Sequence, residues 1–237
     1  MQNAGSILIE IAENAATDLA GHGSQGTGLI QLEWEPFTDD LAPLGDEFED
    51  ISTLNQWHRL NDTEGWDANK LELLDIDNTV SGHMRIMPYT TSWFMDLTGP
   101  LVYKEITGDF AVTMHMDIQR RDNQPGRPQR EFSLGGIMIR TPRDTQAAAP
   151  QPNAPSTNRL LWPPNSYATD WEPDTENYIF LSVGTSDDTG PDNIWNYEVK
   201  TTLNGQSTLY YGREGVPEDT GIVTLQAVRR GSTFLLL

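Results

Sequence analysis

Apolar and polar residues alternate almost without exception in the stretch 110–118. The apolar residues take every second position, namely Phe110, Val112, Met114, Met116 and Ile118. Because successive side chains of a β-strand point to opposite faces, this pattern predicts a half-buried strand. Thr107-Gly108-Asp109 is a turn signal in front of it, so we expect a hairpin with a preceding strand at 101–106.

Similar short apolar segments recur along most of the chain, separated by residues typical of turns. We expect further strands at 54–60, 70–76, 83–88, 132–140, 178–184, 195–203, 207–211, 221–228 and 232–237. Asn204-Gly205 follows the alternating run 195–203 and accepts the positive φ values of a type I′ turn, which predicts a tight hairpin there. No segment keeps a 3.6-residue apolar period, so we expect little helix. The strand spacing predicts an all-β protein, an antiparallel β-sandwich.

The first 43 residues differ from the rest. Two short apolar runs, 7–11 and 29–34, flank the glycine-rich stretch 21–28. Glycine at this density is typical of a flexible loop, so we interpret the two runs as strands joined by it. The sequence therefore predicts an N-terminal extension at 1–43 and a β-sandwich at 44–237.

The charge of the chain narrows the classes of partner. It has 35 acidic and 15 basic residues, a net charge of −20, and no cysteine. An acidic surface repels phosphate backbones and anionic lipid headgroups, so nucleic acids and membrane surfaces are disfavoured.

No apolar run approaches the roughly 20 residues of a membrane-spanning helix, so we expect no membrane insertion. Without cysteine, disulfides and thiolate metal sites are excluded.

Several motifs carry a family resemblance. They lie at 46–48, 52–57, 87–93, 104–110, 135–140, 176–178 and 197–202. Through them, the chain from Asp46 onward resembles the concanavalin A-like lectin/glucanase superfamily, especially the bacterial modules grouped as the DUF1349-type family. The resemblance implies a jelly roll of two curved antiparallel sheets, in secreted or cell-surface proteins that often handle carbohydrate. It implies no catalytic pair, because fold and chemistry are separate questions.

Aromatic residues in or beside predicted loops are the candidate sugar-binding groups. They are Trp66, Tyr89, Trp93, Trp162 and Trp171. Flat rings stack on the C–H faces of sugars, and we expect Trp93 and Trp162 to do so from one concave face. The alternative is that these rings are core residues, since aromatic side chains bury large areas.

Acidic residues at alternate positions are the candidate catalytic groups. Glycoside hydrolysis needs two carboxyl groups, about 5 Å apart for retention. Glu172, Asp174 and Glu176 have the spacing found in laminarinase-type enzymes, but Pro173 would disrupt a central strand. A second group consists of Glu72, Asp75 and Asp77.

Clustered carboxylates also suggest a structural calcium ion, which takes roughly six to eight oxygen ligands. Asp46, Glu47 and Asp50, with Glu49 between them, form one candidate site. Asp187, Asp188 and Asp192 form another. The alternative for both is solvated surface.

The sequence favours a carbohydrate-recognition or surface module without catalysis, extracellular or at the cell surface, with a polysaccharide or glycan as partner. One alternative is a glycoside hydrolase or polysaccharide lyase of jelly-roll fold. Another is a structural protein that self-associates through its terminal strands. The apolar run 232–237 would leave an open edge. The strands of 1–43, from the same or a neighbouring molecule, or strands beyond Leu237, would complete that edge.

Overall fold

The structure of the protein is a computed structural model. The structure describes residues 5–9, 30–34, 39–64, 71–89, 91–95, 97–124, 126–128, 130–142, 176–185, 195–212 and 221–237. It divides into two compact units, Met1–Gly45 and Asp46–Leu237. In the first unit β1 (Gly5–Ile9) pairs antiparallel with β2 (Ile30–Trp34), and the 3-10 helix η1 spans Ala42–Leu44.

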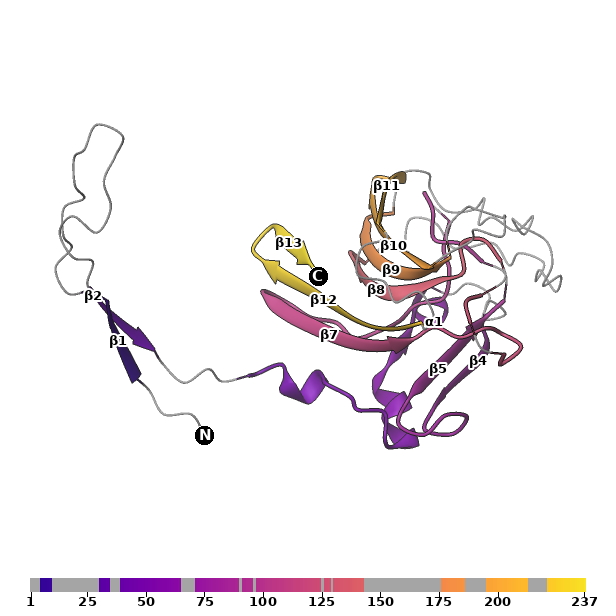
Figure 1. Ribbon diagram of the computed structural model, residues 1–237, viewed down its shortest axis with the longest axis horizontal. Helices are drawn as coiled ribbons and strands as arrows, with labels where there is room; N and C mark the ends of the chain where they lie inside the picture. The colour runs from indigo at the N-terminus through magenta and orange to yellow at the C-terminus, as the bar shows by residue number, and fades with distance from the viewer. Residues whose placement is uncertain are drawn as a thin grey trace. The chain divides into compact units, whose positions relative to one another are not determined.

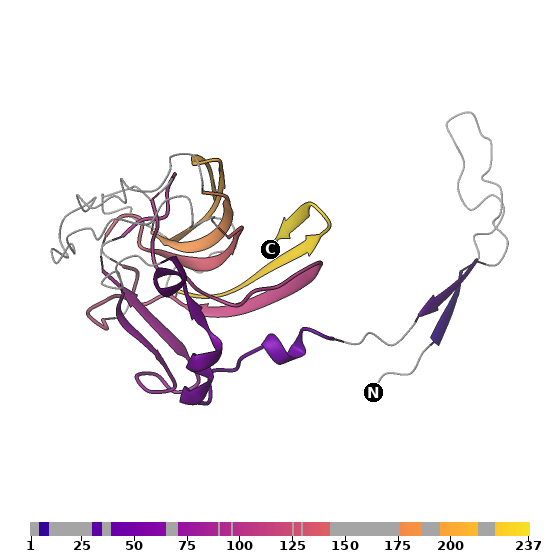
Figure 2. The ribbon, with the colours of Figure 1, turned by 180° about the vertical axis from the view of Figure 1, so that it is seen from behind.

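Two antiparallel sheets dominate the second unit. The four-stranded sheet has the order β11-β10-β9-β8 and consists of β8 (Leu134–Arg140), β9 (Tyr178–Thr185), β10 (Trp195–Leu203) and β11 (Gln206–Gly212). The three-stranded sheet has the order β13-β12-β7 and consists of β7 (Phe110–Asp117), β12 (Ile222–Arg230) and β13 (Thr233–Leu236). Figure 1 and the opposite view in Figure 2 show the two sheets as separate curved layers. The predicted all-β, antiparallel class is confirmed.

The two sheets meet over an apolar core. Leu181 and Val183 of β9 pack with Leu225 of β12, and Met114 and Met116 of β7 lie against them. In β7 the side chains alternate between half-buried and exposed, as the sequence pattern predicts. This arrangement is sandwich-like, since each sheet turns its apolar face inward.

A second apolar cluster covers part of the opposite face of the four-stranded sheet. It contains Leu60, Trp93, Tyr178 and Phe180, with Leu101, Tyr103 and Met138 against it. Leu60 begins α1 (Leu60–Glu64), and Tyr103 ends β6 (Val102–Tyr103), which pairs with β3 (His58–Arg59). Residues from α1 to β6 therefore pack on the outer face of the four-stranded sheet, opposite the sandwich core.

The predicted strand at 54–60 is wrong. The structure has a 3-10 helix, η2, at Ile51–Gln56, and then the two-residue β3 and α1. The Asp50 carboxylate caps η2 by accepting a hydrogen bond from Ser52 N at 2.8 Å. Such local side-chain bonds offer the backbone an alternative to a strand, which an apolar pattern alone does not reveal.

The predicted hairpin between 101–106 and 110–118 is also wrong. β6 covers only two residues and pairs with β3, whereas β7 pairs with β12. Gly108 has a φ of +87°, so the chain changes direction before β7. Lys104 Nζ lies 4.6 Å from the centroid of the ring of Trp57, the residue that follows η2, which is a cation–π contact.

Two other hairpins have well-defined turns. Asn204 and Gly205 have φ values of 48° and 71° between the paired residues Leu203 and Gln206, which confirms the predicted hairpin of β10 and β11. β4 (Leu71–Ile76) and β5 (Met84–Pro88) form the other hairpin.

The apolar run at 232–237 forms a paired strand. β13 pairs with β12, and Leu237 and Gln226 exchange two further backbone hydrogen bonds. Within the described residues, the second edge of β13 has no partner strand. Completion of that edge by another strand stays a prediction. None of the described helices has the length and apolar character required to cross a bilayer.

Candidate functional site

The four-stranded sheet buries polar side chains on the face directed away from the sandwich core. We call it the polar face, and its members are Arg140, Tyr178, Ser182, Asn196, Glu198, Lys200 and Thr202. In β10 the even-numbered residues lie on this face, because Tyr197 and Val199 pack in the sandwich core. Buried charges are costly unless they are paired, so the partners of these groups decide what the face can do.

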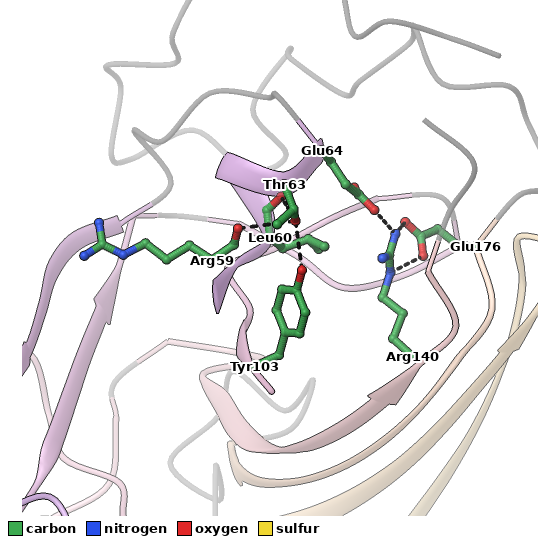
Figure 3. Close-up of polar contacts among 7 residues, drawn as sticks. All are labelled: Arg59, Leu60, Thr63, Glu64, Tyr103, Arg140 and Glu176. Carbon is green, nitrogen blue, oxygen red and sulfur yellow. Dashed lines mark hydrogen bonds and ion pairs between the residues drawn. The ribbon is translucent and has the colours of Figure 1, made fainter. Parts of the chain in front are cut away.

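Arg140 is the centre of a buried ionic triad. Its Nε and Nη2 donate to Glu176 Oε2 and Oε1, both at 2.9 Å. Nη2 also lies 2.6 Å from Glu64 Oε1 (Figure 3). Burial acts to lower the pKa of Arg140, but the hydrogen bonds and charges of Glu176 and Glu64 outweigh it and raise the pKa. Arg140 therefore stays charged and holds both carboxylates.

The triad joins three separate parts of the chain. Glu64 ends α1, Arg140 ends β8, and Glu176 precedes β9. Thr141 N also donates to Asn177 O at 3.1 Å, so the points where the chain leaves β8 and enters β9 lie side by side. The segments that follow α1 and β8 therefore both begin next to the Arg140 triad.

Two hydroxyl groups fix α1 next to the triad. Thr63 Oγ1 donates to Leu60 O at 3.1 Å and accepts a hydrogen bond from the Tyr103 hydroxyl, also at 3.1 Å (Figure 3). Since Leu60 and Tyr103 both belong to the outer apolar cluster, these bonds keep Glu64 in reach of Arg140.

A second buried ion pair lies in the middle of the polar face. Lys200 Nζ lies 2.8 Å from Glu198 Oε1 and donates to Trp93 O at 2.7 Å. Met95 N donates to Ser207 Oγ of β11 at 2.7 Å. The segment around Trp93 is therefore attached to both β10 and β11.

Several buried polar atoms of the face make no hydrogen bond. They are Asn196 Oδ1, both carboxylate oxygens of Glu198, and the Tyr178 hydroxyl. The Glu198 carboxylate has its ion pair with Lys200, but the geometry of that contact is not that of a hydrogen bond. An unsatisfied buried group costs about 1–3 kcal/mol, and native proteins keep few of them. These atoms are the buried polar groups of the face that its neighbours leave without a hydrogen bond.

Burial also perturbs Tyr178. It raises the pKa of this phenol to about 12, although the nearby hydroxyls of Thr202 and Ser207 act in the opposite direction. Tyr178 therefore stays protonated at neutral pH.

Two glycines lie in the strands beside these acceptors. The register places Gly136 opposite Ser182, and Gly184 opposite Asn196. A Cβ on either glycine would lie 1.9 Å from a backbone oxygen, so no larger residue fits. On the β9 side Glu198 is therefore opposite Ser182 and Asn196 is opposite Gly184, and β8 adds Gly136 and Leu134 beyond them.

The structure describes two of the five candidate aromatic residues. Trp93 is 9% exposed, stacks edge-to-face on Tyr178 with ring centroids 5.5 Å apart, and donates from Nε1 to Pro100 O at 3.2 Å. Its environment is that of the core alternative, so we do not include it in the site. Tyr89 follows β5 and is half-buried. Trp66, Trp162 and Trp171 lie outside the described residues.

The candidate catalytic acids that the structure describes all have structural partners. Glu176 is fully buried and bound by Arg140, and Glu72 forms an ion pair with Arg121. Asp75 accepts from Thr79 N at 3.0 Å, and Asp77 accepts from Gly82 N at 2.8 Å, so both hold the β4–β5 turn. Glu172 and Asp174 lie outside the described part of the chain.

The first candidate calcium site is built from turn and cap groups. Asp46 accepts from Phe48 N at 2.9 Å and from Trp57 Nε1 at 2.8 Å. Burial acts to raise the pKa of Asp46, but these hydrogen bonds lower it overall. Asp50 caps η2, and Glu47 is exposed. No set of three or more acidic or histidine residues within the described ranges is arranged to hold a metal. Asp187, Asp188 and Asp192 are outside those ranges.

The sequence reasoning missed Asn196 and Glu198. It used the apolar residues of the run 195–203 and left the polar ones aside. The available signal was that the intervening positions are Asn196, Glu198, Lys200 and Thr202, which are polar but lie in the middle of a sheet.

Comparison with known proteins adds no relative: no family model matches the sequence, and neither a curated protein nor a solved structure matches it. The superfamily resemblance thus stays a prediction, and the geometry carries the functional argument.

Proposed function

We propose that this protein is an extracellular carbohydrate-recognition module with a jelly-roll β-sandwich, and that it binds a polysaccharide or glycan at the polar face. The supporting observation is the set of buried acceptors without hydrogen bonds, above all Asn196 and Glu198. Sugar hydroxyl groups are donors, and carboxylate and amide oxygens are the acceptors that suit them.

The places where two segments with candidate aromatic residues begin support the same function. The chain that follows α1 contains Trp66, and the chain between β8 and β9 contains Trp162 and Trp171. Both segments start at the Arg140 triad, at the edge of the polar face. A sugar-binding site commonly combines such rings with buried polar groups.

The charges argue against the lyase alternative. On and beside the polar face, the carboxylates of Glu64, Glu176 and Glu198 face the cations of Arg140 and Lys200, which leaves one net negative charge. Polysaccharide lyases act on uronic acids, whose carboxylates this charge repels.

The carboxylate arrangement argues against a hydrolase on this face. A hydrolase needs two available carboxyl groups. Both oxygens of Glu176 accept hydrogen bonds from Arg140, which leaves Glu198 as the carboxylate of the polar face without hydrogen bonds among the described residues. Recognition without catalysis is the function that this arrangement favours.

The test is binding of the full chain to an array of polysaccharides, measured by affinity electrophoresis together with release of reducing ends. We expect retention by at least one polysaccharide and no release. Trp162→Ala or Trp171→Ala should weaken binding by about 1–3 kcal/mol, the usual contribution of ring stacking.

Tyr210→Ala is the matched control, because Tyr210 is an aromatic residue that is 60% exposed on β11. It should bind like the wild type. A wild-type protein that binds no polysaccharide of the array would contradict the proposal, and release of reducing ends would replace it with the hydrolase alternative.

A further inference from the structure

We infer that Asn204 is a site of hydrolytic modification, the deamidation of its side chain, and that contacts between the β10–β11 turn and the residues before β9 protect it in the folded protein. The chain has one Asn-Gly pair, Asn204-Gly205, and Asn204 is exposed to water. Glycine has no Cβ to hinder the approach of its nitrogen to the preceding side chain. The inference holds whether or not the chain binds a glycan.

The reaction joins two neighbouring groups of the turn. After Gly205 N loses its proton to base, it attacks Cγ of Asn204, and the new N–C bond closes a five-membered imide ring. The bond from Cγ to the side-chain nitrogen breaks, and this nitrogen takes up a proton and leaves as ammonia. Water then adds to one of the two ring carbonyls and breaks its bond to the ring nitrogen. The products are aspartate and isoaspartate, and water is the single co-reactant.

The folded structure withholds the nucleophile of this reaction. Gly205 is buried, and its N–H donates to Glu176 O at 3.0 Å. A proton held in a buried hydrogen bond is not accessible to base, so the nitrogen becomes nucleophilic only when this bond opens. Asn204 N donates to Asn177 Oδ1 at 2.9 Å, so a second bond holds the turn against the residues before β9.

The hairpin geometry acts in the same direction. Asn204 and Gly205 have φ values of 48° and 71°, and the paired residues Leu203 and Gln206 close the turn. Ring formation moves the Gly205 nitrogen toward the Asn204 side chain and distorts a turn that strand pairing holds on both sides. Deamidation therefore requires the turn to separate first from the residues before β9.

Arg140 is the positioning residue for this protection. It binds both carboxylate oxygens of Glu176 at 2.9 Å, and Glu176 O is the acceptor of the Gly205 N–H. Loss of Arg140 would leave the Glu176 carboxylate buried without this partner, which favours movement of the whole residue. The rate of deamidation therefore follows how often the contact between Glu176 and Gly205 opens.

The modification has a structural consequence for β11. Isoaspartate routes the main chain through the former side chain, which adds a carbon atom to a turn whose flanking residues are paired. β11 stands at the end of the four-stranded order, and its Ser207 Oγ accepts from Met95 N at 2.7 Å. We expect isoaspartate to disturb the register of β11, whereas the aspartate product keeps the backbone and accepts a positive φ.

The experiment follows Asn204 in the full chain by mass spectrometry of its peptide, in native mildly alkaline buffer and in guanidinium chloride at the same pH. Chromatography separates the aspartate and isoaspartate products. Arg140→Leu is compared with two controls: Arg120→Leu removes an arginine that pairs at the surface, and Leu225→Ala removes a core side chain between the two sheets. Hydrogen exchange of the Gly205 amide is measured in the wild type.

We expect the native protein to deamidate about tenfold or more slowly than the unfolded chain, because even a small opening free energy lowers the reactive population by this factor. Arg140→Leu should raise the native rate about tenfold or more, whereas both controls keep the wild-type rate. The isoaspartate form should melt at a lower temperature than Asn204→Asp, which makes the same charge change without the additional backbone atom. The Gly205 amide should exchange slowly, and this measurement decides the matter if Arg140→Leu does not fold.

Three results would overturn the inference. Equal rates in the native and unfolded protein, or an unprotected Gly205 amide, would show that the turn does not shield Asn204. Equal acceleration by Arg140→Leu and Leu225→Ala would assign the effect to global stability and remove Arg140 from the protection. Absence of deamidation in the unfolded chain would contradict the site itself.

Discussion

The Tyr178 hydroxyl is buried beside the hydroxyl groups of Thr202 and Ser207, and this makes the residue a reporter of the polar face. Its pKa is raised to about 12 from an ordinary value of 10.0, primarily because burial penalises the phenolate. An acid with a raised folded-state pKa contributes its full stability below the unfolded-state value. That contribution is lost as pH rises from about 10 to 12.

We therefore predict that Tyr178→Phe has almost the wild-type free energy of unfolding at pH 8 and becomes relatively more stable above pH 10. The difference should grow by about 1.4 kcal/mol for each pH unit between 10 and 12. Urea unfolding of both proteins at several pH values measures it. A constant difference across this range would mean that the hydroxyl is solvated.

Single residues also show where sequence reasoning ends. Trp93 lies in a predicted loop, yet its indole is buried against Tyr178 and Pro100. Local sequence indicates that a residue lies in a loop, but not that distant strands cover that loop. Asn196 and Glu198 show the converse, because they are buried. Polar residues that alternate with apolar neighbours in a strand normally face solvent.

At the scale of elements, the Arg140 triad ties α1 to two strands of the central sheet. Removing the arginine would leave two carboxylates buried without their common partner. We predict that Arg140→Leu lowers the free energy of unfolding by about 3–5 kcal/mol, as is usual when one partner of a buried pair is lost.

Arg120→Leu is the matched control, because Arg120 pairs with the exposed Asp122 at the surface. It should change the denaturation midpoint little, as is usual for surface ion pairs. Similar effects of the two substitutions, measured by urea unfolding at pH 7, would show that the triad is not a stabilising element.

Elements with a strong local signal were predictable. The alternation of β7 and the Asn204-Gly205 turn both appear as expected. The pairing of strands was not predictable in the same way: β6 joins β3, and β7 joins β12, more than a hundred residues later. Partner choice depends on contacts between distant segments, and a local turn signal contains no information about them.

At the scale of the whole molecule, acidity is the dominant property. The net charge is −20 and the isoelectric point is about 4.3. Self-repulsion of this size destabilises a compact state, and salt screens it within a Debye length of about 10 Å at 0.1 M.

We predict that the melting temperature at pH 7 rises when sodium chloride is increased from about 10 mM to about 300 mM, a range in which screening becomes short-ranged. The same addition at a pH close to the isoelectric point is the control and should have a smaller effect. A melting temperature that falls with salt at pH 7 would mean that favourable ion pairs outweigh the repulsion.

The fold class of the molecule was predictable from strand spacing, whereas the candidate site was not. The aromatic and acidic candidates were chosen by residue type and spacing, and the described ones are held by partners such as Arg140 for Glu176 and Thr79 for Asp75. The polar face emerges only when β8, β9 and β10 are in register, because its residues are far apart in sequence.

The bonds between the end of β8 and the residues before β9 bear on how the chain between these strands can change. Arg140 and Thr141 bond to Glu176 and Asn177, so the two strands keep their positions whatever chain connects them. Doubling the length of a flexible connection costs only about 0.6 kcal/mol in closure entropy. We therefore expect changes in the length of the chain between these anchors to alter the free energy of unfolding little.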